Sequence, residues 1–531
     1  LHGDLNNVTN HFTIENLTRS GYYKVDADGL KRQTQSVFAN AEIGWRSFLY
    51  LSLTGRADWD SSLALSERGN KPFFYPSIGL SSILSEVIDL PEWFSFLKAR
   101  FSFTSVGNAY DPYLTKVRYV YDDQLDQYKA ESLYPNSDLK PEITKSYEAG
   151  LNMRFFKNTL NFDITYYNSD TRNQTFAAPL PASSGYTAVN IQAGSVQNQG
   201  IEMALGYKNE WRDFGWSSNF TFTYNKNKVT KYKGELVREW RTDANGNKVW
   251  YQNVGTVANG SSNLIVEGHE MNEYYMMNPY KGNGSYFNSD GTVNINGGPK
   301  DGMIRTEADM KWLQAMFDAG YKFYPNQAIG KDKIWYGDMI YADYNGDGIY
   351  GNDDDRDFQS VSWRPKYYFG LQASMTWKGF DLSMNWAGAA GFKIDYYKQT
   401  QNSVSVTHGY GLGYDIAYDH YFFDPENPND PRTNIYSETP RLVGYQNSGQ
   451  ASATSSWHLK NGNYIKLKNL TIGYTFPKEW MKVAFIQNAR VYLSGENLLT
   501  ITKFEGSDPE RMAGDGYMPI RQYTVGVNVT F

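Results

Sequence analysis

The sequence predicts an all-β fold, namely a transmembrane antiparallel β-barrel with long extracellular loops. Apolar and polar residues alternate along segments of about ten residues, as in strands with one face on lipid and the other on water. Short polar turns join some of these segments, whereas other connections are long. No stretch approaches the roughly 20 apolar residues that a membrane helix needs. Because lipid cannot satisfy the backbone groups of an open sheet, a closed barrel is the spanning structure that remains.

The composition suits a surface that faces both lipid and water. Of the 531 residues 16% are aromatic, including 43 Tyr and 14 Trp, so part of this aromatic surface must face something other than water. The formal net charge of -6 argues against a nucleic-acid partner, since phosphate binding needs a basic face. With no Cys in the chain, disulfides and thiolate metal sites are absent.

Residues 146–167 show the alternation most clearly. In the first strand of this hairpin one face carries Tyr147, Ala149, Leu151, Met153 and Phe155. A turn at 156–158 leads to a return strand whose apolar face carries Leu160, Phe162, Ile164 and Tyr166. The pattern recurs at 37–55, 201–224 and 369–386, the last with a tight turn at Lys378-Gly379. We expect about fourteen such strands.

In a barrel the apolar set faces lipid and the polar set faces a wet lumen. Four charged residues are therefore lumen-facing candidates, although a solvated wall residue is the preferred interpretation of any one of them: Arg154, Asp163, Glu202 and Asp381. Aromatic residues at segment ends are expected to form interfacial girdles, and they include Trp45, Tyr207, Trp216 and Trp377. A soluble β-sandwich also alternates, but its strands usually run only about 5 to 6 residues.

The two ends of the chain carry further expectations. The last strand, 523–531, alternates strictly and stops on Phe531, and in a closed barrel it must pair with the first strand to remove its edge. The chain begins Leu1-His2-Gly3, without an initiator Met or an apolar export segment. We therefore expect the export signal to lie outside this sequence.

Two connections are long and rich in Gly, Asn, Tyr and Ser, namely 231–337 and 395–463. They are expected to be outward loops. Within the first, residues 308–317 place Met310, Leu313, Met316 and Phe317 at helical spacing. This predicts a short surface helix that packs a loop.

Residues 343–354 match a calcium-binding loop. The expected ligands are the oxygen donors at positions 1, 3, 5 and 12 and the carbonyl at position 7. They are Asp343, Asn345, Asp347, Asp354 and Ile349. Gly348 stands at position 6, where the sharp turn is needed, but position 12 is Asp where a longer Glu is usual. The alternative is an acidic turn without an ion; a bound ion would stiffen the loop rather than catalyse.

Elsewhere the sequence shows no catalytic constellation. The six His are scattered, without metal-ligand spacing or a paired acid. There is neither a Gly-rich phosphate loop nor a nucleophile elbow. We therefore expect that the protein is not an enzyme.

Five short strings in order resemble the SusC-like (SusC/RagA) branch of TonB-dependent outer-membrane transporters. They are 136–142 leading into 147–150, then 198–202, 337–354, 464–474 and 495–499. The second reads Asn-Gln-Gly-Ile-Glu, and the last reads Gly-Glu-Asn-Leu-Leu. Together they span nearly the whole chain and precede the terminal amphipathic strand.

This resemblance implies a 22-stranded barrel in the bacterial outer membrane, with an amino-terminal plug and a TonB-contacting segment. It also implies a SusD-like surface lipoprotein as partner, a possible dimer of such pairs, and oligosaccharides or oligopeptides as substrates. The plug, the TonB-contacting segment and the first strands do not occur in this sequence. Residues 1–531 are thus expected to be the C-terminal part of the barrel, and the missing part a separate piece of the same protein.

The function expected from this resemblance is TonB-dependent active import of a nutrient oligomer. A passive porin is one alternative, and an outer-membrane adhesion or binding barrel that does not transport is another. The mixed aromatic and polar loops suit sugars and peptides equally. The sequence therefore leaves open the substrate, the oligomeric state and whether the acidic loop holds an ion.

Overall fold

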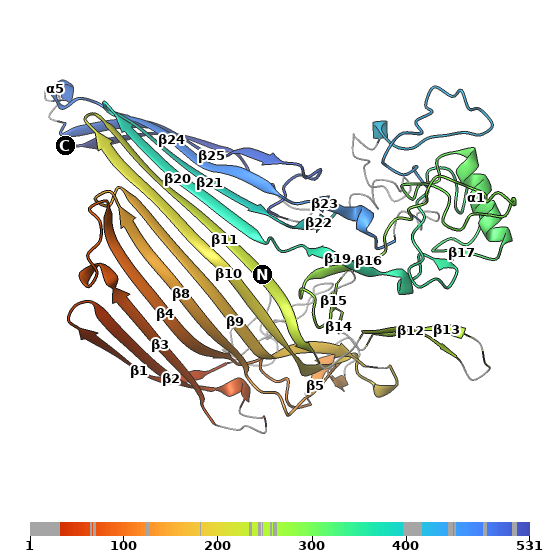
Figure 1. Ribbon diagram of the computed structural model, residues 1–531, viewed down its shortest axis with the longest axis horizontal. Helices are drawn as coiled ribbons and strands as arrows, with labels where there is room; N and C mark the ends of the chain where they lie inside the picture. The colour runs from red at the N-terminus through yellow and green to blue at the C-terminus, as the bar shows by residue number, and fades with distance from the viewer. Residues whose placement is uncertain are drawn as a thin grey trace, which may run out of the picture.

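The computed structural model describes residues 32–531, except 64–65, 67–70, 118, 123–126, 131, 181, 233–235, 243–245, 247, 255–256, 259–262, 397–416, 444–449, 451–452, 482–485 and 512–517. Residues 1–31, to which the expectation about the beginning of the chain refers, lie outside the described residues. No helix in the described part of the chain is both long and apolar enough to cross a membrane. The fold is dominated by one large antiparallel sheet (Figure 1).

Thirteen strands form the wall, and the two-residue β7 (Leu133–Tyr134) pairs with β10 to make a 14-stranded sheet. From one edge of the sheet to the other, the wall strands are β1 (Thr34–Trp45), β2 (Leu49–Asp60), β3 (Phe73–Ile83), β4 (Phe94–Asn108), β8 (Glu142–Phe155), β9 (Leu160–Pro179), β10 (Ala188–Trp211), β11 (Phe214–Tyr232), β20 (Tyr367–Trp377), β21 (Phe380–Ala390), β24 (Tyr464–Thr475), β25 (Asn488–Thr502) and β26 (Gln522–Thr530).

The remaining elements lie in the connections between wall strands. The helices whose bounds lie within the described residues are α1 (Glu307–Asp318), α5 (Lys478–Met481) and the short 3-10 turns η2 (Ser61–Leu63), η3 (Leu84–Glu86), η4 (Ala182–Ser184), η5 (Asp353–Asp355) and η7 (Ser456–His458). The strands are β5 (Tyr119–Asp122), β6 (Gln127–Ala130), β12 (Leu236–Thr242), β13 (Lys248–Val254), β14 (Val257–Ala258), β15 (Leu264–Ile265), β16 (Glu273–Met276), β17 (Lys322–Phe323), β18 (Ile349–Tyr350), β19 (Asp357–Ser362), β22 (Lys393–Asp395) and β23 (Leu459–Asn461).

Neighbouring wall strands pair antiparallel and in register over long stretches, which confirms the expected antiparallel β class. In the expected hairpin, Leu151 lies opposite Ile164 and Phe155 opposite Leu160, so the apolar residues of both strands share one face. β1 and β26 form the two edges of the sheet in the described chain. The predicted pairing of β26 with a first strand is therefore not made among the described residues.

Tight turns join the strands at one end of the wall. The turns after β8 and β20 contain left-handed residues, with φ of 57° at Lys157, 67° at Asn158 and 90° at Gly379. Such backbone angles match the right-handed twist of hairpin strands. The two longest connections, after β11 and β21, leave from the opposite end and run toward the elements around α1 in Figure 1, whereas the connection after β24, which holds α5, lies at the tight-turn end.

The four aromatic residues predicted for girdles all lie at the tight-turn end, on the apolar face. Trp45 and Trp377 are about half exposed. They therefore belong to a single girdle, and the second must be formed by other residues. Strands are also longer than the expected ten residues, since β10 has 24 and β9 has 20. Polar residues continue the backbone pairing beyond the apolar band, because ladder hydrogen bonds form in water as well as in lipid.

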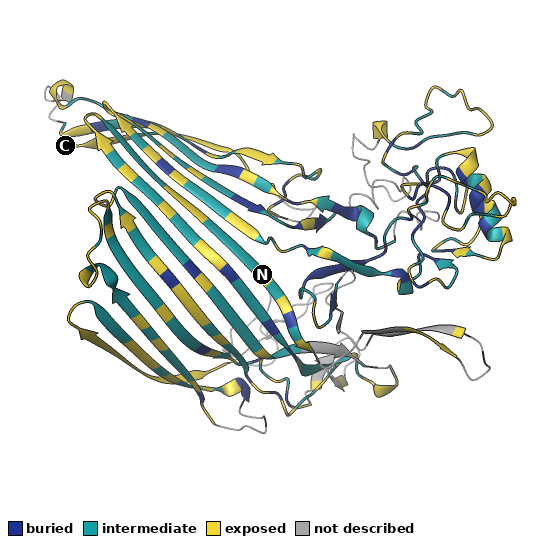
Figure 2. Ribbon diagram, in the orientation of Figure 1, coloured by how far each residue is buried: buried dark blue, intermediate teal, exposed yellow. Residues whose placement is uncertain are grey.

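The two long connections fold together into a compact lobe at the end of the wall opposite the tight turns (Figures 1 and 2). Its core contains Trp312, Leu313 and Met316 from α1, together with Ile340 and Tyr421. The predicted helix 308–317 is confirmed as α1, and its N-terminus is held by a capping box between Thr306 and Asp309. The two long connections thus share one hydrophobic core and do not fold as separate loops.

We predict that Trp312→Ala in the full-length protein unfolds the lobe but not the wall. Trp312 is fully buried, stacks on Tyr280 at 5.3 Å and donates its indole N–H to the Asn294 carbonyl at 2.8 Å. Removing such a side chain costs about 3–5 kcal/mol. Hydrogen–deuterium exchange should rise across residues 277–350, while β8 to β11 remain protected. Trp480→Ala, at an exposed position of α5, serves as control, and equal exchange in both variants would contradict the prediction.

Candidate functional site: the inner wall and the lobe

The two faces of the wall differ in chemistry. One face carries the apolar set, and large members of that set such as Leu151, Tyr166 and Leu205 are exposed on it. The opposite face, which we call the inner face, carries Asn152, Asp163 and Asp381. Strand alternation places the four predicted lumen residues on this inner face. They fall into two ion-pair clusters and two separate positions.

The first cluster crosses three adjacent strands. Asp163 on β9 accepts hydrogen bonds from both Nη atoms of Arg100 on β4, at 2.8 and 2.7 Å, and from Asn152 Nδ2 at 2.9 Å. β8 lies between β4 and β9, and there Gly150 lies beneath the guanidinium, because a Cβ at Gly150 would lie 2.8 Å from Arg100 Nε. The missing side chain lets the ion pair span the middle strand.

The second cluster repeats this arrangement at the other side of the sheet. Asp381 on β21 accepts from Nε of Arg490 on β25 at 2.8 Å and also from its Nη2. β24 lies between these strands, and a Cβ added at Gly473 would lie 2.5 Å from Arg490 Nη2. Each cluster is therefore an Arg–Gly–Asp crossing of three neighbouring strands.

The remaining two predicted lumen residues form no such crossing. The Arg154 guanidinium lies over the Phe96 ring at 4.8 Å, near the tight turn after β8. Glu202 is exposed on the inner face of β10. The inner face therefore carries both fixed ion pairs and an exposed carboxylate. Arg100 and Arg490 were not predicted; the only sequence signal was that each stands at a polar position of an alternating strand.

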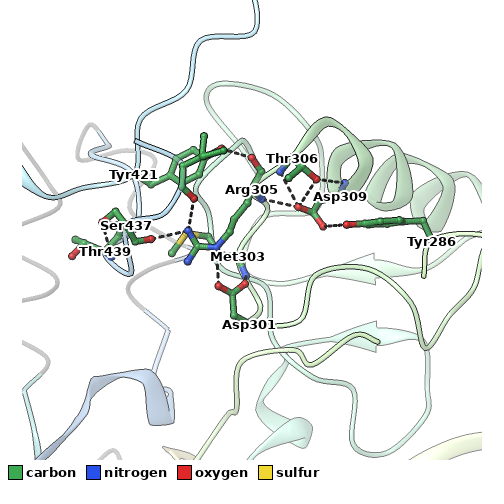
Figure 3. Close-up of polar contacts among 10 residues, drawn as sticks. Tyr286, Asp301, Met303, Arg305, Thr306, Asp309, Tyr421, Ser437 and Thr439 are labelled. Carbon is green, nitrogen blue, oxygen red and sulfur yellow. Dashed lines mark hydrogen bonds and ion pairs between the residues drawn. The ribbon is translucent and has the colours of Figure 1, made fainter. Parts of the chain in front are cut away.

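Arg305 joins the two long connections of the lobe (Figure 3). Its Nη1 donates to the carbonyls of Ile435 and Ser437 at 2.8 and 2.7 Å, and its Nε donates to Asp301 at 2.7 Å. The Tyr421 hydroxyl donates to the Arg305 carbonyl. The two long connections of the lobe are therefore fixed to one another by directed hydrogen bonds as well as by apolar packing.

A buried ion pair makes a second connection. Arg441 donates to both oxygens of Asp338 at 2.9 Å, and their side chains are 14% and 3% exposed. Because both partners are mostly removed from water, leaving either one unpaired would be costly. This pair holds the segment before the acidic loop against the second long connection.

The acidic loop is built from backbone-capping carboxylates. Asp343 accepts from the N–H groups of Gly346 and Gly348 at 2.6 and 2.9 Å. Asn345 Oδ1 accepts from the N–H of Asp347 at 2.8 Å, and Asp347 Oδ1 from that of Ile349 at 2.7 Å. Four of the five predicted ligands thus lie in one tight turn, whose own N–H groups occupy the carboxylates.

The fifth predicted ligand, Asp354, lies in η5, and the neighbouring Asp355 is the residue that turns inward. Asp355 is fully buried and accepts from the N–H groups of Tyr344, Gly351 and Asn352 at 2.8, 2.9 and 3.2 Å. Burial raises the pKa of Asp355 to about 7 and also raises the pKa of Asp343. Among the described residues no group of three or more His, Asp or Glu is arranged to hold a metal ion.

Known proteins match this chain over nearly its whole length. Residues 2–254 match the family model described as TonB dependent receptor-like, beta-barrel. The chain is 24% identical to TonB-dependent receptor P3 of Formosa agariphila, covering 99% of this chain and 48% of that protein. It is 23% identical to TonB-dependent receptor SusC of Bacteroides thetaiotaomicron, covering 94% and 45%. The chain therefore spans about half the length of these relatives.

Solved structures show the same fold. The RagAB peptide importer in its open-open state superposes with a TM-score of 0.67 at 19% identity, covering 98% of this chain and 49% of that one. The RagAB peptide transporter gives a TM-score of 0.65 at 19% identity, covering 94% and 48%. At this level of identity the likeness establishes the barrel wall and its order of strands.

The crossings predict that Gly473→Ala weakens the wall, since the added Cβ would lie within 2.6 Å of both Arg490 and Asp381. A loss of about 1–3 kcal/mol is expected, measured from the urea midpoint of the full-length protein refolded in detergent micelles. Arg490→Ala should cause a similar loss, and the double variant should lose less than the sum. Gly206→Ala is the control, because its Cβ would meet only ordinary contacts at 3.7 Å; full additivity would refute the crossing.

Calcium binding by the acidic loop stays a prediction and has a direct test. Titration of the full-length protein with Ca²⁺ in a calorimeter should show one site that Asp343→Asn with Asp347→Asn abolishes. Asp290→Asn, in an exposed turn, should bind as the unaltered protein does. If Ca²⁺ gives no heat, and if a chelator leaves hydrogen exchange of the loop unchanged, the loop is an acidic turn held by its own N–H groups.

Proposed function

Because the chain is part of a TonB-dependent receptor β-barrel of the SusC-like kind, we propose that the full protein actively imports a nutrient oligomer across the bacterial outer membrane. The observation that carries this proposal is the two-faced wall beneath a folded lobe. The apolar face suits lipid, the charged inner face suits a wet path, and the lobe forms a structured mouth. Energy for the step comes from TonB through the part of the protein that precedes this chain.

In this proposal the chain supplies the wall and the mouth of the path, and the preceding part supplies the plug and the remaining strands. A SusD-type surface lipoprotein covers the mouth, and two such pairs assemble as a dimer. The lobe supports this arrangement, because Arg305 and the Arg441–Asp338 pair hold its loops in one shape before any partner arrives. No catalytic role is part of this proposal, and the relatives of the chain by sequence are TonB-dependent receptors.

The substrate is an oligosaccharide or an oligopeptide. Aromatic and polar side chains together suit both, because rings stack on sugar faces or side chains and polar groups hydrogen-bond to hydroxyls or peptide groups. One relative by fold is described as a peptide importer, and one relative by sequence is SusC. A binding panel of glycans and peptides, measured on the purified full complex, separates the two classes.

Two other functions fit a membrane barrel. A passive porin would let solute pass without TonB, and an adhesion barrel would hold a ligand at the lobe without translocating it. The folded lobe above the path favours capture followed by import, since a passive pore gains nothing from a rigid mouth. The three functions differ in their dependence on TonB.

We predict that deleting the TonB partner abolishes uptake of the bound oligomer without reducing its binding at the cell surface. Uptake of a radiolabelled oligomer and surface binding at 4 °C measure the two effects separately. Loss of uptake with retained binding is expected only of an energised importer. Uptake that survives the deletion would identify a porin, and binding without uptake in the parent strain would identify an adhesion barrel.

A further inference from the structure

Basic residues gather on the outer face of four adjacent wall strands, near the end that leads to the lobe. On β8, Lys145 lies opposite Asp170 of β9. Asp170 lies opposite Gln197 of β10, and Gln197 lies opposite Lys228 of β11. Directly paired residues project from the same face of a sheet. These four side chains thus form one row across β8 to β11.

The rows on either side add three more cations. Toward the lobe, Arg172 of β9 pairs with Ser195 of β10, which pairs with Lys231 of β11. Away from the lobe, Gln199 of β10 pairs with Lys226 of β11. We call Lys145, Arg172, Lys226, Lys228 and Lys231 the outer cation patch, and all five are exposed.

The patch lies directly above the aromatic edge of the lipid-facing band. The next row down places Tyr166, Ile201, Tyr224 and Tyr367 opposite one another on β9, β10, β11 and β20. Tyrosine rings of this kind mark the level of lipid headgroups. This row is the second girdle, at the end opposite Trp45 and Trp377. The cations therefore stand at the height where lipid phosphates would lie.

The inner face at the same level is neutral. Its rows pair Thr144 with Thr171 through their hydroxyls at 2.8 Å and Ser146 with Ser169 at 2.7 Å, while Asn227 donates to Asn198 at 2.9 Å. The next positions in these rows are the buried Val196 and Val229. The same strands thus carry five cations on the outer face and none on the inner face in these rows. A general attraction for solutes in the lumen does not explain this sorting.

The patch has a large excess of positive charge. Asp170 is its single carboxylate among the described residues of these rows, and Arg172 Nε already lies 2.9 Å from it. Beside the patch is a hollow of about 770 Å³, lined by the cations Lys140, Arg172 and Lys231 and by the carboxylates Asp138 and Asp170, and Lys140 Nζ lies 3.8 Å from Asp138. Three cations thus border a concave surface that is large enough for a phosphorylated sugar.

We propose that the outer cation patch binds the phosphate of a phosphorylated glycolipid in the outer leaflet. The lysines supply the positive field near the surface, and the guanidinium and the hollow supply directed contacts to phosphate. The inference rests on the proposed placement in the outer membrane. It goes beyond that function, because it assigns a lipid site on the wall that takes no part in the import path.

The test uses the full-length protein in detergent and monophosphoryl lipid A as the probe, with binding read by native mass spectrometry. The patch variant carries Lys145→Gln, Lys226→Gln, Lys228→Gln and Lys231→Gln. The control variant carries Lys281→Gln, Lys300→Gln, Lys322→Gln and Lys333→Gln, four exposed lysines of the lobe, so the change in net charge is the same. Heat-modifiable gel mobility shows that each barrel is folded.

We expect the patch variant to lose about tenfold or more in affinity for the lipid, because four of the five cations that face the phosphate are removed. The control variant and the parent should bind alike, and dephosphorylated lipid A should bind the parent as weakly as the phosphorylated lipid binds the patch variant. Equal affinity of parent and patch variant would overturn the proposal. Equal losses in both variants, or displacement of the lipid by inorganic phosphate at equal concentration, would overturn it as well.

Fractionation separates this proposal from the proposed function. If the parent protein is in the outer membrane and imports its oligomer, but the patch variant keeps the lipid, only the lipid site is wrong. If the parent is absent from that membrane, the import proposal fails first.

Discussion

Backbone pairing between antiparallel neighbours is the constraint on which the rest of this structure depends. Every wall strand must satisfy its N–H and C=O groups sideways, so its side chains can only alternate between two faces. Because the thirteen wall strands of the described chain keep one order, this alternation assigns each of their side chains to one of the two faces of the wall. The apolar face, the inner ion pairs and the outer cations are consequences of this single geometric rule.

Alternation therefore made the wall predictable, and it also limited what could be predicted. Asp163 and Asp381 were placed correctly on the inner face, because their strands alternate without interruption. Their partners Arg100 and Arg490 could not be foreseen, since they lie 63 and 109 residues away and meet these acids across an intervening strand. One sequence shows which face a residue takes, but not the order of strands that brings two distant residues together.

Departures from the expected pattern have local physical causes. β10 runs for 24 residues because its backbone ladder continues through polar residues beyond the apolar band. The inward acid of the metal-like loop is Asp355 and not Asp354, because the η5 turn is capped by Asn352 and directs the later residue toward the backbone. The two long connections were expected as outward loops, one of them packed by a short helix. Their aromatic residues instead form a core, since Trp312, Tyr341 and Tyr421 come from segments that only folding brings together.

The glycines beneath the two Arg–Gly–Asp crossings have a consequence for assembly. If β24 slid by one residue past β21, Gly473 would leave its place and the side chain of Ile472 or Tyr474 would be turned under the Arg490 guanidinium. The same holds for β8 beneath Arg100. Each crossing thus favours one alignment of three strands and disfavours the alignments that are shifted by one residue. In a long sheet many shifted alignments keep the same number of backbone hydrogen bonds. The two glycines favour the native alignment over these, because each leaves room for a guanidinium.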